Sequence, residues 1–127
     1  NISYDLRIGR NINSKSTKNV DFQTMRKFVK IVGIYLDNAI DATKELKNKE
    51  INIEFFVQEG YLCVLIANTF KGCIDIEKMG TMGYTSKGGK HGYGLSLAKE
   101  ILSEDKNLVS ETSIYKNIMS QVIKVKM

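Results

Sequence analysis

The 127-residue sequence is close to the usual size of one domain, and we expect residues 1–127 to form a single domain. Hydrophobic residues make up 43% of the chain, which is enough for a core. The net charge is +5, but the lysines are spread along the chain rather than clustered, and this distribution argues against a nucleic-acid-binding protein. No apolar run approaches the roughly eighteen residues of a membrane span. Two cysteines without zinc-ligand spacing predict reduced thiols in a cytosolic domain, and one histidine excludes a histidine-rich metal site.

The N-terminal part predicts a strand, a connection and a long helix. Residues 3–8 alternate polar and apolar side chains, which is typical of a strand, and residues 11–19 are polar and read as a connection. Asp21 is suited to cap a helix that runs from Phe22 to about Leu46.

Apolar residues occur on two faces of this predicted helix. We expect the core face to consist of Phe22, Met25, Val29, Val32, Leu36, Ala39, Ile40, Thr43 and Leu46. Ile31, Ile34 and Asn38 lie roughly opposite, at about 100° per residue. A helix on a sheet is normally polar on that side, so the second face is expected to be covered by a ligand, a lid or a partner, or else by a packed third layer in which Asn38 is solvent-facing or locally bonded.

The C-terminal part predicts two hairpins that flank a second helix. The expected elements are strands 51–57 and 61–67 with a turn at 58–60, a break at 68–72, a helical turn at 74–79, a helix at 93–104, and strands 108–115 and 118–125 with a turn at 116–117. The order of elements predicts an α+β, two-layer sandwich, in which helices cover one face of a mixed, mostly antiparallel sheet.

The stretch 80–97, GTMGYTSKGGKHGYGLSL, is rich in glycine. It holds six glycines between positions 80 and 94, together with Lys87, Lys90 and His91 and no acidic residue. A glycine loop that leads into a helix favours an anion, most plausibly phosphate, although a flexible surface loop would have a similar composition. The Walker A pattern does not match, and a GxGxxG pattern reaches Leu97 where its third glycine belongs.

Two separated segments resemble the GHKL nucleotide-binding superfamily. Residues 36–42, LDNAIDA, resemble its asparagine box, and residues 92–97, GYGLSL, resemble its GxGLxL box. Residues 83–88, GYTSKG, resemble the approach to that box in histidine kinases. The combination is most similar to the Agr-type quorum-sensing peptide-receptor kinases, and the resemblance spans about residues 29–102. It implies the GHKL, or Bergerat-type, α/β sandwich.

The resemblance assigns roles to individual residues. Asn38 would ligate the Mg²⁺ that bridges the phosphates of ATP, since a neutral amide oxygen suits this ion. Gly92 and Gly94 match the glycines whose backbone meets the phosphates, and Leu95 is the residue that follows them. Lys87 and His91 are candidates for phosphate contact from a lid at residues 80–91, or else mobile solvated side chains. The lid is expected to become ordered when nucleotide binds.

Three positions depart from the superfamily pattern. Asn68 stands near the place of the carboxylate that receives the adenine amino group, as an asparagine does in Agr-type kinases. A neutral acceptor at Asn68 predicts modest ATP affinity. The alternative is that Asn68 is only a turn residue that closes the strand. Ile34 replaces the glutamate that activates water in gyrase-like members, so no general base is expected there. Asp41 stands where many histidine kinases have a lysine.

The resemblance implies the catalytic and ATP-binding domain of a sensor histidine kinase. Such a domain presents the γ-phosphate of Mg-ATP to a histidine on a separate dimerisation domain of the same receptor, and acts indirectly on a response regulator. Because His91 is the only histidine, this chain is not expected to autophosphorylate on its own. We expect a cytoplasmic part of a membrane-anchored bacterial receptor, without direct membrane contact. A GHKL ATPase or serine kinase, and a degenerate non-catalytic nucleotide-binding module, remain alternatives.

Overall fold

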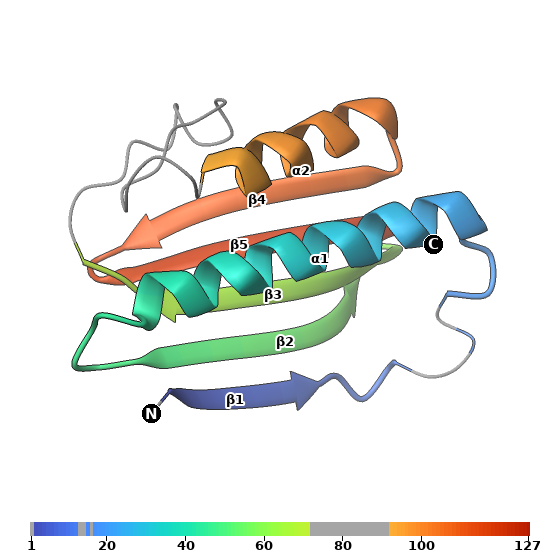
Figure 1. Cartoon of the computed structure of the whole chain (residues 1–127). Helices are drawn as coiled ribbons and strands as arrows, with labels where there is room; N and C mark the ends of the chain where they lie inside the picture. Colours follow the sequence, from blue (N-terminus) through green and yellow to red (C-terminus); the bar gives the residue numbers. More distant parts are fainter. Residues whose placement is uncertain (1, 13–14, 16, 72–91) are drawn as a thin grey trace.

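The computed structural model describes residues 2–12, 15, 17–71 and 92–127, and it combines one sheet with two helices (Figure 1). The elements in chain order are β1 (Ser3–Ile8), α1 (Phe22–Thr43), β2 (Glu50–Gln58), β3 (Tyr61–Thr69), α2 (Gly92–Glu104), β4 (Leu108–Tyr115) and β5 (Ile118–Lys126). The helical turn expected at residues 74–79 and the lid expected at residues 80–91 lie outside the described residues.

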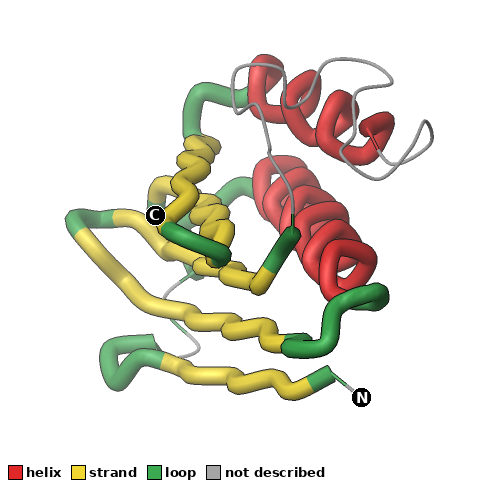
Figure 2. The backbone as a smooth tube through the Cα atoms, turned by 90° about the vertical axis from the view of Figure 1, so that its left-hand side faces the viewer, coloured by secondary structure: helices red, strands yellow, loops and turns green. Residues whose placement is uncertain are grey.

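The sheet has five strands in the order β1-β2-β3-β5-β4. β1 is parallel to β2, whereas the other neighbouring strands are antiparallel. Both helices lie on the same face of the sheet, as Figures 1 and 2 show from two directions. The predicted two-layer α+β sandwich with a mixed, mostly antiparallel sheet is therefore confirmed.

Tight turns close the two predicted hairpins. Glu59 and Gly60, between β2 and β3, have φ angles of 53° and 83°, and Lys116, between β4 and β5, has a φ of 55°. Positive φ values in two-residue turns match the right-handed twist of the strands that they join. These turns fix the register that aligns β2 with β3 and β4 with β5.

Helix α1 begins as the sequence predicts and ends earlier. The Asp21 carboxylate accepts hydrogen bonds from the backbone N–H groups of Gln23 (3.1 Å) and Thr24 (3.3 Å), which satisfies two donors of the first turn. The helix ends at Thr43, whereas the sequence predicted about Leu46. The backbone N–H of Leu46 instead donates to the Thr43 carbonyl at 3.0 Å, in the turn that leads the chain toward β2.

The core face of α1 differs from the predicted one. Its buried residues are Thr24, Phe28, Ile31, Tyr35, Ala39 and Thr43. Ile31, which was predicted on the opposite side, is fully buried, whereas Phe22 and Val29 are 71% and 60% exposed. The core face is thus rotated by roughly 70° from the predicted one, at about 100° per residue. Apolar residues cover a wide arc of this helix, so periodicity did not fix which part meets the sheet.

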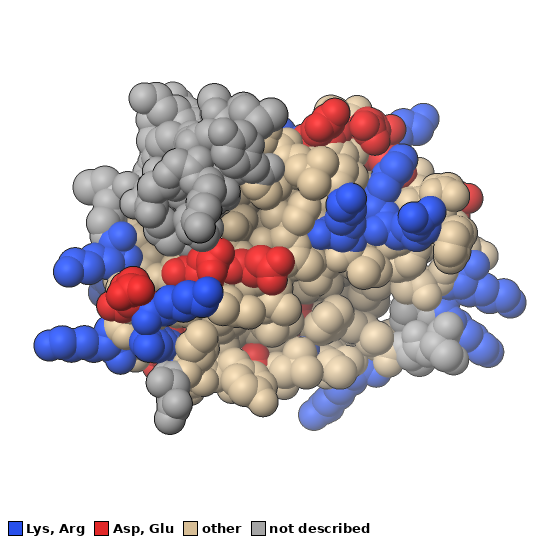
Figure 3. Space-filling model, viewed as in Figure 1, with Lys and Arg blue, Asp and Glu red and all other residues tan. Residues whose placement is uncertain are grey.

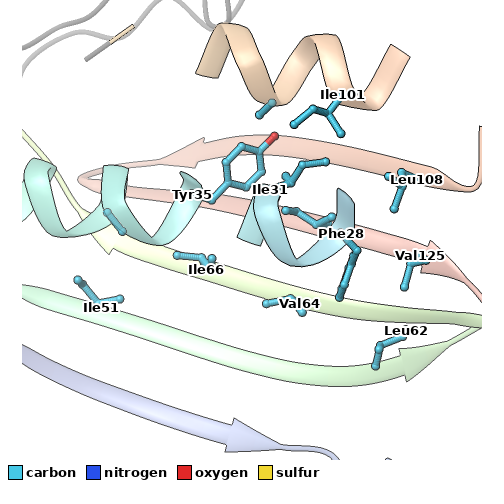
Figure 4. Packing of buried hydrophobic residues seen from close by; sticks show 13 residues of the cluster. Phe28, Ile31, Tyr35, Ile51, Leu62, Val64, Ile66, Ile101, Leu108 and Val125 are labelled. Carbon is cyan, nitrogen blue, oxygen red and sulfur yellow. The ribbon is translucent and has the colours of Figure 1, made fainter. Parts of the chain in front are cut away.

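The hydrophobic core lies between the two helices and strands β2, β3, β5 and β4. Figure 4 shows Phe28, Ile31 and Tyr35 of α1 among side chains of β3, β5 and α2. The Tyr35 hydroxyl shares a hydrogen bond of 2.8 Å with the Ser110 hydroxyl of β4. Burial raises the pKa of the Tyr35 hydroxyl, and the bond to Ser110 offsets part of this effect. The phenol therefore stays neutral and ties α1 to the far edge of the sheet.

Strand β3 continues beyond its predicted end. The sequence predicted a break at residues 68–72, but β3 includes Asn68 and Thr69. Asn68 lies between Ile51 of β2 and Met119 of β5 in the register, so both sides of the strand are paired at this point. The Thr69 hydroxyl donates to the Asn48 carbonyl at 2.8 Å and accepts from the N–H of Glu50 at 3.2 Å. Pairing on both sides outweighs the local turn preference of asparagine.

A polar cluster joins the first turn of α1 to the turn after α2. The Asp105 carboxylate accepts hydrogen bonds from the Thr24 hydroxyl (2.6 Å) and from the N–H of Asn107 (3.0 Å). Lys27 lies 3.7 Å from the same carboxylate. The bond from Thr24 is the main cause that lowers the pKa of Asp105, and Asn107 and Lys27 add to the effect against the opposing effect of burial. The charged form of Asp105 therefore holds the two segments together.

This cluster predicts a loss of stability in acid. Because the pKa of Asp105 is lower in the folded state, its contribution is present above the unfolded-state pKa of about 3.9 and is lost as the pH falls through the folded-state value. We expect Thr24→Val to lower the free energy of unfolding by about 1–2 kcal/mol at pH 7, because it removes a hydrogen bond to a charged group. The difference in free energy of unfolding between the wild type and Thr24→Val should become smaller toward pH 3. Urea denaturation of both proteins at pH 7 and at pH 3 measures this difference.

Thr112→Val is the matched control, because Thr112 lies on β4 and forms no contact with Asp105 in the described structure. The free energy of unfolding of Thr112→Val should differ from that of the wild type by the same amount at pH 7 and at pH 3. A Thr24→Val effect of equal size at pH 7 and pH 3 would contradict the proposed role of the Asp105 charge.

Candidate functional site

The ends of three elements meet at one end of the molecule. The carboxyl ends of α1 and β3 and the amino end of α2 lie together in Figure 1. Asn38 lies in the last two turns of α1, Asn68 is the penultimate residue of β3, and Gly92 is the first residue of α2. The fold therefore brings three of the predicted segments to one end, although they are far apart in the sequence.

Helix α1 lies close to the first turn of α2. A methyl group added at Gly94 would lie 3.4 Å from Cγ2 of Ile34 and 4.0 Å from Oδ1 of Asn38. Nδ2 of Asn38 is buried. The second face predicted for α1 is thus covered at least in part by α2, which lies beside α1 on the same face of the sheet and does not form a third layer. Asn38 is held with its amide oxygen toward the start of α2.

The amino end of α2 presents backbone donors at this position. The first turn of any helix has N–H groups without an intrahelical acceptor, and the helix dipole adds partial positive charge. Gly92 and Gly94 both belong to this turn, and glycine adds no Cβ that would keep an anion away from the backbone. The backbone N–H groups of this turn can donate to an anion, and the amide oxygen of Asn38 beside them can act as a ligand to a cation.

Asn68 lies in the floor of the sheet beneath the helices. Leu62, Val64 and Ile66 of β3 belong to the core, and Asn68 follows them on the same face because side chains alternate along a strand. It is 3% exposed, and its Nδ2 donates to the Thr69 carbonyl at 2.9 Å. The alternative of a turn asparagine is wrong, since the residue is paired within β3.

The remaining predicted site residues are placed differently. The Leu95 side chain packs against the core, so only its backbone is placed to meet a ligand at the start of α2. Lys87 and His91 lie outside the described residues. Sequence reasoning placed Ile34 on the second face of the helix and at the position of the missing glutamate, and in the structure its Cγ2 lies 3.4 Å from a methyl group added at Gly94 in the first turn of α2.

Charge is unevenly distributed along α1. Arg26, Lys27 and Lys30 occupy its N-terminal half, whereas Asp37 and Asp41 occupy its C-terminal half. Figure 3 shows acidic side chains over this second half. Lys44 lies 3.1 Å from the Asp41 carboxylate and offsets its charge, while Asp37 is exposed. The acidic groups therefore disfavour a bare anion next to Asn38 and favour an anion that carries a cation.

The described residues contain no protein cage for a metal. No three His, Cys, Asp or Glu side chains come together within this part of the chain. Cys63 is a buried free thiol, and burial raises its pKa, whereas Cys73 lies outside the described residues. A single amide oxygen still fits Mg²⁺, which keeps several waters and takes most of its other ligands from substrate phosphates. None of the described helices is both long and apolar enough to cross a membrane.

Comparisons with known proteins agree with this geometry. Residues 24–125 match the family model described as the GHKL domain. Histidine kinase AdeS of Acinetobacter baumannii superposes with a TM-score of 0.68 at 14% identity, over 99% of this chain and 54% of its own. The catalytic domain of histidine kinase ThkA has a TM-score of 0.63 at 20% identity, over 98% of this chain and 80% of its own.

ThkA in complex with the response regulator protein TrrA gives a TM-score of 0.67 at 15% identity, over 98% of this chain and 34% of that chain. This chain thus spans about half the length of AdeS. No curated protein matches the sequence. At these identities the likeness establishes the fold, which is that of histidine kinase catalytic domains.

Proposed function

The chain belongs to the GHKL domain family, and on this premise we propose that it binds ATP with Mg²⁺ as the catalytic domain of a sensor histidine kinase. The observation that carries the proposal is the position of Asn38, whose amide oxygen lies 4.0 Å from the place of a Gly94 side chain at the start of α2. This arrangement puts a cation ligand beside a set of backbone donors, which is what a metal-bound phosphate chain needs.

Each described residue then has a defined task. The N–H groups of the first turn of α2, including those of Gly94 and Leu95, bind phosphate oxygens. The Asn38 amide oxygen holds the cation, and Mg²⁺ would neutralise phosphate charge that the exposed Asp37 otherwise repels. Lys87 and His91 are proposed to contact the phosphates from the lid.

Asn68 is proposed to receive the base. Its Nδ2 donates to the Thr69 carbonyl, which fixes the amide and leaves Oδ1 as the atom suited to accept from the adenine amino group. A neutral amide acceptor forms a weaker bond than a carboxylate, so we expect modest affinity for ATP. The same asparagine supports membership of the Agr-type branch of peptide-receptor kinases, and hence a role in quorum sensing.

The phosphoryl acceptor is proposed to lie on another domain. His91 is the only histidine of the sequence, and it belongs to the lid segment. We therefore propose that residues 1–127 are a single catalytic domain of a larger, membrane-anchored bacterial receptor whose dimerisation domain supplies the histidine. The ThkA complex with TrrA supports a response regulator as the partner that acts after this step. The chain alone should not autophosphorylate.

The structure offers less support for a GHKL ATPase or serine kinase. Such enzymes would need a base four residues before Asn38, where this chain has Ile34. The Ile34 side chain instead packs toward Gly94 and against the core. It contributes apolar packing and cannot accept a proton. A non-catalytic nucleotide-binding module is the second alternative, and phosphotransfer distinguishes it from the kinase.

Magnesium dependence tests the role of Asn38. In calorimetric titrations with ATP, the wild-type affinity should fall when Mg²⁺ is removed with EDTA. Asn38→Ala should weaken binding by about tenfold or more, equivalent to about 1.4 kcal/mol, and should abolish most of the magnesium effect. Asn52→Ala is the control, since Asn52 is an exposed amide on β2, away from α2. Wild-type, magnesium-dependent affinity in Asn38→Ala would refute the site.

Two glycine variants separate the site from the fold. Gly94→Ala adds a methyl group beside Asn38, whereas Gly33→Ala adds one to α1 with no atom within 4 Å. Both replace a helical glycine, so each should raise the free energy of unfolding by up to about 1 kcal/mol. Only Gly94→Ala should lower the affinity for Mg-ATP, by several-fold, because its methyl group lies between the cation ligand and the phosphate donors. Equal affinities in the two variants would contradict this placement.

Phosphotransfer in trans tests the proposed activity. The chain, radiolabelled Mg-ATP and a histidine-bearing dimerisation domain of an Agr-type kinase should together give an acid-labile phosphohistidine on the added domain. Replacement of the acceptor histidine by glutamine should abolish the label. ATP binding without transfer would indicate a non-catalytic module, and phosphate release without an acceptor would indicate an ATPase.

A further inference from the structure

Strand β1 forms an apolar edge of the sheet. It is the first strand in the sheet order and pairs with β2 alone in the described structure (Figure 1). Tyr4, Leu6 and Ile8 are 75%, 53% and 65% exposed. Their β2 neighbours in the register are Ile51, Ile53 and Phe55, so they lie on the face of the sheet that carries the helices. Among the described residues, neither helix lies over this edge strand, as Figure 2 shows.

The outer edge of β1 has backbone groups available for pairing. The N–H groups of Ser3 and Gly9 donate to the Lys49 and Phe55 carbonyls of the β2 side, each at 2.8 Å. In a strand, alternate residues direct their N–H and C=O groups to opposite edges. The odd-numbered residues therefore face β2, and Tyr4, Leu6 and Ile8 present their backbone groups outward. Such an edge is a template for another strand.

We propose that β1 is a self-association surface, on which the β1 strand of a second copy of this chain pairs in antiparallel fashion. Leu6 lies on the two-fold axis, opposite Leu6 of the second copy. Tyr4 then lies opposite Ile8 of the second copy, and Asp5 lies opposite Arg7 of the second copy. The interface is isologous, so every contact occurs twice.

Two features select this register: the even-numbered residues alone direct their backbone groups outward, and the charges of Asp5 and Arg7 are opposite. It places the outward-facing residues Tyr4, Leu6 and Ile8 opposite one another, as ladder hydrogen bonds require. The smallest slip that keeps this parity, in either direction, puts Asp5 opposite Asp5 or Arg7 opposite Arg7, and like charges in directly opposed positions destabilise a sheet. Larger slips leave fewer residues of the strand paired. Within one chain, Asp5 and Arg7 already form an exposed ion pair of 2.9 Å, which can be exchanged between copies at little cost.

The size of this surface predicts a weak, concentration-dependent dimer. A six-residue strand buries less than the area of a standard protein interface. Sedimentation velocity of the full chain should therefore show monomer at roughly 10 µM and a growing dimer fraction toward about 1 mM. A monomer throughout this range would overturn the proposal.

Charge reversal tests the pairing itself. Asp5→Arg and Arg7→Asp should each reduce dimerisation by about tenfold or more, because they place like charges opposite one another. An equimolar mixture of the two variants should form a heterodimer, since each then supplies the charge that the other lacks, and the double variant should dimerise like the wild type. Glu104→Arg, which changes the net charge as much as Asp5→Arg but lies on α2, should have no effect. Failure of the mixture to associate would overturn the register.

Hydrogen exchange provides a readout of individual amides. At high concentration the amides of Tyr4, Leu6 and Ile8 should exchange more slowly, whereas those of Asp5 and Arg7, which already face β2, should change little. Dimerisation without this alternation would place the interface elsewhere and refute the proposal.

Discussion

The packing of α1 against the sheet on one side and against α2 on an adjoining side is the contact on which the rest of the structure depends. One side of α1 places Phe28, Ile31 and Tyr35 in the core. An adjoining side places Ile34 toward Gly94, close enough that an added methyl group would lie 3.4 Å away. Because Tyr35, Ala39 and Thr43 are buried on either side of Asn38 along the helix, these close-packed contacts determine where Asn38 lies.

The proposed polar site is thus held in position mainly by apolar contacts. Asn38 contributes one amide oxygen, and α2 contributes backbone groups, but neither could stay at a fixed distance without the hydrophobic surface beneath them. The bonds of Asp105 to Thr24 and of Tyr35 to Ser110 add to this from the other end and from the far strand. Small residues at Gly94 and Ala98 allow the two helices to approach, and Ala98 is itself almost fully buried.

The sequence predicted the elements and the proximity of Asn38 to Gly94 better than it predicted the orientation of the helix. Asn38 and Gly94 could be paired in advance because their local motifs are specific for residue type. The face of α1 that packs on the sheet could not be predicted, since apolar residues cover enough of the helix circumference to pack against both the sheet and α2. The course of β3 through Asn68 was missed for a related reason: pairing with β2 and β5 is a tertiary effect, and asparagine alone indicates a turn.

The sheet order keeps the two proposed surfaces apart. β1 lies at one edge and β4 at the other, and α2 contacts β4 and α1. The two-fold axis of an antiparallel strand pair runs perpendicular to the sheet, so pairing through β1 would leave the helices of both copies on the same face. The amino ends of the two α2 helices would then stay apart, each separated from the junction by the width of its own sheet. Association at β1 therefore does not require the nucleotide site to be covered, and the two properties can vary independently of each other.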